Sequence, residues 1–197
     1  MTPVRTIILR SSLEPRHLRL LALLGAASFF EGYDLNIITV ALKPLRTTFG
    51  LDQAAASLWI AVIYLGALPA IPAARWADRR GRRDLLLASI LGYTLATAAT
   101  AVAPGIGSFA AAQFIARFLL VLQSALMWTV VAEELPAAGR GLGFGWLATL
   151  SALGTGWSAI LWGAVLYPLG LSWRWLYVAA LPVLGVVLVL RLSLIHI

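Results

Sequence analysis

The sequence lacks cysteine and contains little charge. Its 197 residues include no cysteine and two histidines, and Asp, Glu, Lys and Arg together make up only 12% of the chain. Without cysteine, disulfide bonds and thiolate metal sites are excluded. The two histidines, His17 and His196, lie near opposite ends of the chain and have no neighbouring ligand residues. The sequence therefore predicts neither a metal site nor a cofactor.

The chain is rich in apolar residues instead. Hydrophobic residues make up 61% of the sequence, and the mean hydropathy is +0.90. This composition does not suit a soluble domain, which needs a polar surface, so we expect lipid to be the solvent. A net charge of +7 would suggest a nucleic-acid partner for a soluble protein. Here the basic residues gather in connections on one side of the apolar segments, which predicts a lipid bilayer and no nucleic acid.

Six apolar segments approach or exceed the roughly 20 residues that an α-helix needs to cross a bilayer. They are 18–42, 54–74, 85–102, 109–131, 141–166 and 175–190. The sequence thus predicts an all-α membrane protein with a six-helix transmembrane bundle at 18–191, preceded by a cytoplasmic tail at 1–17. Asp52 is placed to cap the second helix. Pro69 and Pro72 favour kinks within that helix, because each removes a backbone donor.

The distribution of basic residues predicts the orientation of the chain. Arg75 and the run at 78–83 crowd the connection after the second segment, and Gly81 in that run suits a tight turn between helices. Only Lys43, Arg46 and Arg174 lie in connections on the other side. Lys and Arg concentrate in cytoplasmic loops, so both termini are expected to be cytoplasmic. Tryptophans near the segment ends, Trp173 and Trp175 among them, are expected to anchor at the headgroups.

Three charged residues fall inside the predicted spans: Glu31, Asp34 and Arg117. Each such charge costs about 2.5 to 3.5 kcal/mol on insertion scales, so these residues are candidates for function. Asp34 and Arg117 are predicted at a similar depth, about 12 Å below the outer surface, where they can pair. Glu31 lies one turn deeper on the same face as Asp34. A carboxylate there can bind and release a proton as its access to water changes. The alternative is a static ion pair that only fixes helix register.

Three motifs carry a resemblance to a known family. The connection at 74–83 resembles the signature loop of the major facilitator superfamily. Residues 133–141 resemble the acid, proline and Arg-Gly pattern that precedes the fifth helix of its sugar and organic-acid porters. The segment 30–34 is similar to the Gly-Tyr-Asp element of its proton-coupled metabolite symporters, including aromatic-acid and sugar-type porters, and 117–118 matches their fourth-helix arginine. The resemblance covers nearly all of 18–191.

The resemblance implies alternating access, in which two six-helix halves rock around a site at the middle of the membrane. This chain would be the N-terminal half, made of two inverted three-helix repeats, and its partner would be a missing C-terminal six-helix half. The residues implied are Asp34, Glu31 and Arg117 for proton coupling, Asp78, Gly81, Arg82, Glu134 and Arg140 for the cytoplasmic gate, and Tyr33 and Gln123 for the substrate cavity.

The function expected is proton-coupled symport of a small organic acid or sugar-like solute. The fifth segment has no proline at 154–157, whereas drug antiporters typically carry a Gly-Pro element there. A proton-linked antiporter or efflux protein remains an alternative, as does a six-helix membrane scaffold or sensor. An enzyme is not expected, because neither an intramembrane serine-protease motif nor a zinc-protease motif is present. The arginine-rich usage suggests a GC-rich bacterium, hence a bacterial inner membrane.

The final residues, 192–197, read as an in-frame translation of a sequencing-adapter end. We therefore expect native sequence to end near Arg191, and the last six residues are left out of the fold prediction.

Overall fold

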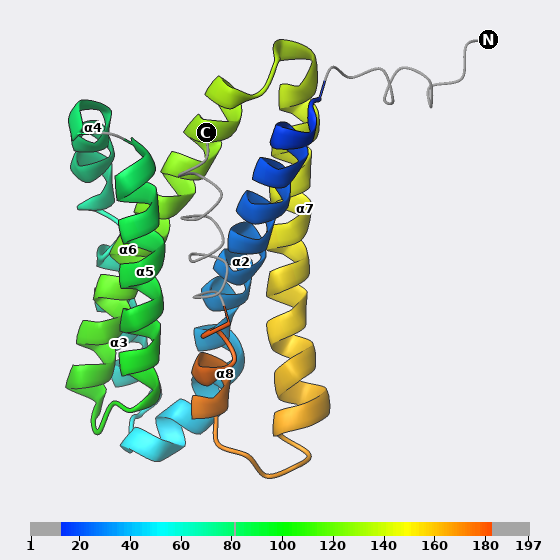
Figure 1. Ribbon diagram of the computed structural model, residues 1–197. Helices are drawn as coiled ribbons and strands as arrows, with labels where there is room; N and C mark the ends of the chain where they lie inside the picture. Colours follow the sequence, from blue (N-terminus) through cyan, green and yellow to red (C-terminus); the bar gives the residue numbers. More distant parts are fainter. Residues whose placement is uncertain (1–12, 81, 183–197) are drawn as a thin grey trace.

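The computed structural model describes the backbone of residues 13–80 and 82–182, and the side chains of those residues outside 76–83 (Figure 1). All regular elements in these ranges are helical. They are α2 (Pro15–Phe49), α3 (Gln53–Leu65), α4 (Ala70–Arg80), α5 (Arg82–Ala101), α6 (Ile106–Glu134), α7 (Ala137–Ile160), the π-helix η1 (Leu161–Leu166) and α8 (Arg174–Val178).

Five stretches of the described chain are long and apolar enough to cross a membrane. They are Pro15–Phe49, Gln53–Arg75, Asp84–Ala101, Ile106–Glu134 and Ala137–Leu166. They confirm the first five predicted spans in type and order. The sixth predicted span, 175–190, begins in α8, but the part beyond residue 182 lies outside the described residues, as does the segment 192–197.

Helix α2 is longer than the sequence predicted. The apolar run ends at residue 42, but the helix continues through Pro44 and ends only at Gly50, whose φ of 63° is left-handed. The Gly50 N–H donates to the Arg46 carbonyl, which gives the helix a glycine C-cap. Hydropathy located the membrane-spanning core of this helix, whereas the backbone conformation of one glycine determines where the helix stops.

The second span is interrupted rather than merely kinked. Residues 66–69 form turns between α3 and α4, in which the N–H groups of Gly66, Ala67 and Leu68 each donate to the carbonyl three residues earlier. Pro69 and Pro72 have no N–H to offer, so the regular i to i−4 pattern is broken here. At the start of this span, the Asp52 carboxylate accepts from the Ala55 N–H at 2.7 Å, which confirms the predicted cap.

The helices pack as two groups. Helix α7 runs alongside α2, while α3, α4 and α5 gather around α6, which leans across toward α7 at the upper end of Figure 1. Several hydrogen bonds join α2 to α7. Among them, the Ser28 hydroxyl donates to the Leu147 carbonyl at 2.9 Å, and the Thr155 hydroxyl donates to the Gly32 carbonyl at 3.1 Å. Hydrogen bonds of this kind join helices where lipid offers no alternative partner.

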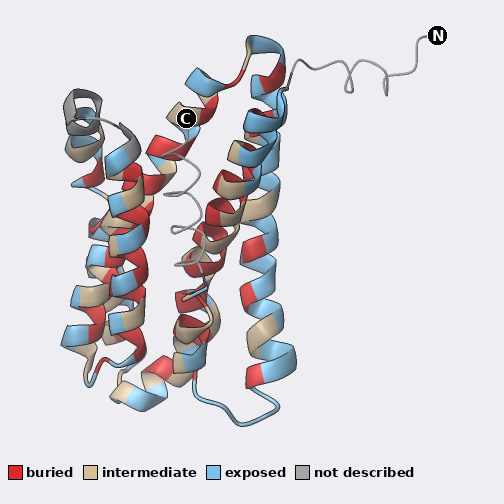
Figure 2. Ribbon diagram, in the orientation of Figure 1, coloured by how far each residue is buried: buried red, intermediate tan, exposed pale blue. Residues whose placement is uncertain are grey.

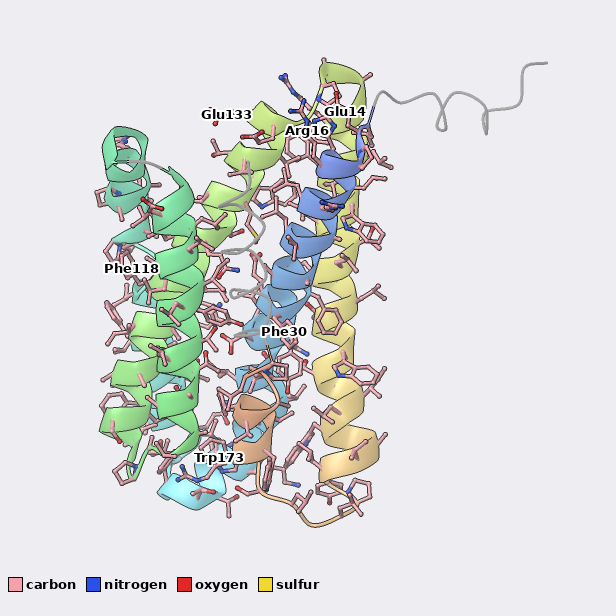
Figure 3. All side chains as sticks on the ribbon, in the orientation of Figure 1. Glu14, Arg16, Phe30, Phe118, Glu133 and Trp173 are labelled. Atoms are coloured by element: carbon pink, nitrogen blue, oxygen red, sulfur yellow. The ribbon has the colours of Figure 1, made fainter. Side chains whose placement is uncertain are left out.

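An aromatic cluster closes the lower end of the bundle. Trp173, labelled in Figure 3, contacts the rings of Phe49, Phe109 and Tyr177, and its indole N–H donates to the Thr48 hydroxyl at 3.0 Å. Trp173 is only 3% exposed. The expectation that it anchors at the membrane interface is therefore wrong, because its ring is buried in the bundle. Trp175, two residues later, is 52% exposed.

Candidate functional site

Two carboxylates lie in the interior of the bundle at mid-height. Asp34 and Glu31 are on one face of α2 and are 3% and 9% exposed, respectively. Both follow Phe30, which is labelled in Figure 3, within about one turn of α2. The groups that interact with Asp34 come from three other helices: Thr97 on α5, Arg117 on α6 and Tyr177 on α8. Asp34 thus lies where four helices approach one another.

Arg117 lies near Asp34 but is not its direct partner. The side chain is 4% exposed and interacts electrostatically with Asp34. Within the described part of the chain, however, the two side chains form no direct ion pair. The guanidinium instead stacks over the Tyr64 ring of α3, with 4.5 Å between the guanidinium carbon and the ring centroid. The sequence allowed the two side chains to pair; in this structure the arginine stacks on α3 and interacts with Asp34 electrostatically without direct contact.

Sequence reasoning did not single out Tyr64. A lone tyrosine in an apolar span is usually explained by packing, and no spacing rule connects it with Arg117. The available signal was depth in the membrane: comparing residues at equal depth in the predicted second and fourth spans could have suggested that Tyr64 lies near Arg117.

Several buried polar side-chain atoms of the bundle, among them atoms of Asp34 and of two residues that interact with it, have no hydrogen-bond partner among the described residues. They are Asp34 Oδ1, Thr97 Oγ1, the Tyr177 hydroxyl and both amide atoms of Gln123. An unpaired buried polar group costs about 1 to 3 kcal/mol, so a cluster of them in one bundle is unusual for a purely structural interior. The arrangement gives the Asp34 carboxyl group polar neighbours that can accept or donate hydrogen bonds when Asp34 gains or loses a proton.

The remaining candidates inside the bundle have different environments. Glu31 interacts with Ser124 of α6, so it also faces the fourth span. Gln123 is fully buried. Tyr33 is 1% exposed, and its hydroxyl donates to the Leu176 carbonyl at 2.7 Å, which joins α2 to α8. The Tyr33 hydroxyl is thus engaged in holding two helices together.

The helix ends next to the predicted gate residues lie at one end of the bundle. The end of α4, the start of α5, the end of α6 and the start of α7 are all at the upper end of Figure 1. Gly81, one of the predicted gate residues, lies outside the described residues, and so do the side chains of Asp78 and Arg82. Glu134 and Arg140 are exposed, and the Arg140 Nε donates to the Leu135 carbonyl at 3.2 Å, next to the end of α6.

Apolar helices of membrane-spanning length around buried charges define a multi-pass membrane protein with a polar interior site. Residues 24–196 match the sequence profile of the Major Facilitator Superfamily, and the chain belongs to this family. The fold agrees: a bacterial homologue of the human lysosomal transporter Spinster, solved inward-facing and unoccupied, superposes with a TM-score of 0.76 at 20% identity. The match covers 92% of this chain and 44% of that one.

Three curated relatives show similar sequence over part of their length. The niacin transporter NiaP of Acinetobacter baylyi is 33% identical over 66% of this chain, and the Multidrug resistance protein B homolog of Mycobacterium tuberculosis is 30% identical over 80%. The gallate transporter of Pseudomonas putida is 28% identical over 72%. The matched regions are 32%, 29% and 35% of these relatives, so the chain spans about a third of their length.

Proposed function

We propose that this chain is one half of a secondary transporter that moves a small organic acid across the membrane by alternating access, in symport with protons. Asp34 is the proposed proton-binding group, with Glu31 and Arg117 as its charged neighbours. One observation carries the proposal: the Asp34 carboxylate is 3% exposed at the meeting point of four helices, and one of its oxygens has no hydrogen-bond partner among the described residues. Such a group can change protonation state when its access to water changes.

A second helical bundle is the proposed partner of this half. The most exposed span is the one formed by α7 and η1: 17% of its apolar window is buried, compared with 56% in α2, and α7 is largely pale blue in Figure 2. Its exposed face carries a stripe of small residues, namely Gly141, Gly145, Ala148, Ala152, Gly156 and Gly163. In lipid, small residues let another helix approach closely, so this stripe suits a protein neighbour.

The substrate class follows from charge and from the relatives. Niacin and gallate, which name two of the relatives, are both aromatic carboxylates. In this chain, Arg117 supplies a buried guanidinium whose geometry matches a carboxylate. We therefore favour an organic acid over a sugar. Gln123, fully buried with both amide atoms unpaired among the described residues, is the further cavity candidate.

The proposed location is a bacterial inner membrane with both termini in the cytoplasm. This orientation places the arginine-rich connection at 78–83 on the cytoplasmic side, as positive-inside topology requires. Glu134 and Arg140 then lie on the same side, because the two connections share one end of the bundle. Asp78, Gly81, Arg82, Glu134 and Arg140 are the proposed gate on that side.

The test is uptake into membrane vesicles from cells that express the complete reading frame containing this chain. Asp34→Asn keeps the size of the side chain and removes its ability to ionise, so we expect uphill accumulation driven by a pH gradient to be abolished while membrane insertion is retained. Asp52→Asn is the matched control, because Asp52 is an exposed helix cap and asparagine caps equally well. Undiminished uphill accumulation by Asp34→Asn removes Asp34 from the coupling role.

The same vesicles distinguish the alternative functions. One relative is named a multidrug resistance protein, which favours export as the second candidate. If substrate leaves the cytoplasmic side as protons enter, the protein is an antiporter. If the complete reading frame produces no solute movement in either direction, a scaffold or sensor role replaces transport.

A further inference from the structure

The side chain of Arg117 is largely buried, and among the described residues its guanidinium has no hydrogen-bond acceptor. Among the described residues, its contact is with the face of the Tyr64 ring, and no carboxylate, carbonyl or hydroxyl oxygen accepts from it. Guanidinium carries five N–H donors in a fixed fork, which normally find acceptors when buried. An arginine that is 4% exposed and held against a ring is therefore a cation with unused donors.

The packing of α3 against α6 fixes this arrangement. Gly66 of α3 meets the backbone of Phe114 in α6, because a Cβ atom on Gly66 would clash with the Phe114 carbonyl oxygen. Tyr64 lies two residues before this contact and Arg117 three residues after it. Long side chains in a helix point back toward its N-terminus, and both helices run in the same direction in Figure 1, so Arg117 reaches back to the level of Tyr64.

The pair is also reachable from outside the described bundle. Tyr64 is 46% exposed, so its ring forms the boundary between Arg117 and the surroundings of α3. No guanidinium nitrogen is among the fully buried, unpaired polar atoms of the described residues. The small exposed part of Arg117 therefore includes its charged end. The guanidinium donors thus lie at the rim of the exposed Tyr64 ring.

We infer that Tyr64 is a specificity-determining residue: its ring holds the Arg117 guanidinium away from Asp34 and presents it to the carboxylate of the substrate. A carboxylate accepts two parallel hydrogen bonds from guanidinium, which an uncharged amide of the same shape does not match. The attraction between the cation and the ring keeps the guanidinium in place without consuming its N–H donors. The inference rests on the proposed transport function, because it names the substrate group that the site selects.

The test measures binding of benzoate and of its uncharged analogue benzamide to purified protein made from the complete reading frame, at one pH and without a gradient. We expect the wild type to prefer benzoate by about tenfold, as bidentate pairing with a buried cation implies. Tyr64→Leu and Tyr64→Met remove the aromatic face and are expected to abolish most of this preference by weakening benzoate binding alone. Tyr64→Phe keeps the face and is expected to retain the preference.

Tyr167→Leu is the control, because Tyr167 is 70% exposed and contacts Trp162 rather than a cation. The inference is overturned if folded Tyr64→Leu or Tyr64→Met protein keeps the wild-type preference, if Tyr64→Phe loses as much as Tyr64→Leu, or if the wild type does not prefer benzoate. These outcomes are separate from proton coupling. If the preference depends on Tyr64 but Asp34→Asn still accumulates substrate, the inference is supported and the proposed coupling is rejected. If the preference does not depend on Tyr64 but Asp34→Asn abolishes accumulation, the coupling is supported and the inference is rejected.

Discussion

Gly154 of α7 lies directly against the backbone of Phe29 in α2, so that a Cβ atom at position 154 would overlap the Phe29 carbonyl oxygen. The contact is reciprocal, because a Cβ atom on Gly32 of α2 would overlap the Ser151 carbonyl oxygen of α7. Two glycines, one from each helix, thus allow the backbones to touch. In lipid there is no hydrophobic driving force between helices, so the close packing that such an approach permits is a main source of helix association.

We predict that Gly154→Ala destabilises the bundle by about 1 to 3 kcal/mol, the usual cost of inserting a methylene into a tight contact. The added methyl group meets backbone rather than a side chain that can rotate away. Gly156→Ala is the matched control, since no atom lies near a Cβ at that position. Thermal unfolding in detergent measures both. Equal unfolding temperatures for the two variants would contradict the close contact.

Tyr33→Phe is expected to reduce stability without changing substrate affinity. The Tyr33 hydroxyl donates to the Leu176 carbonyl, and an interhelical hydrogen bond in a membrane protein contributes about 0.6 to 2 kcal/mol. Thermal unfolding and substrate binding are measured on the same preparation. A loss of affinity at unchanged stability would instead assign Tyr33 to the substrate cavity, as the sequence predicted.

Gln123→Leu is expected to raise stability and to weaken substrate binding. Both amide atoms of Gln123 are buried and unpaired among the described residues, so replacing the amide with an apolar group of similar size removes a penalty of about 1 to 3 kcal/mol. We predict a higher unfolding temperature and weaker substrate binding. If stability falls, then the amide has a structural partner; if binding is unchanged, then Gln123 does not face the substrate.

Gly145→Leu tests the stripe on α7. No atom of the described chain lies near a Cβ at this position, so the isolated bundle is expected to tolerate leucine. In the complete transporter, the larger side chain is expected to obstruct the second bundle and to abolish most transport. Unfolding of this chain alone and uptake by the complete protein are the two measurements. Full transport would show that lipid, not protein, covers this face.

The sequence predicted the helices well because lipid imposes a strong requirement on span length and composition. It also located the three buried charges, since so few residues of that kind occur in spans. The direction of the Arg117 side chain was not predictable, because it depends on how α3 packs on α6. The contacts of each glycine could not be predicted either. Gly66 touches Phe114, whereas Gly141 and Gly145, which are equally small, have no atom of the described chain near a Cβ position. Spacing identifies small residues but not which neighbour faces them.

The interruption at 66–69 divides the second span into two helices joined by a short series of turns. An unbroken helix transmits a tilt along its whole length, because every turn is bonded to the next. Here α3 and α4 are connected by turns of three-residue hydrogen bonds. We therefore expect any change of angle between α3 and α4 to occur at these few residues, while Tyr64, at the end of α3, keeps its place over Arg117.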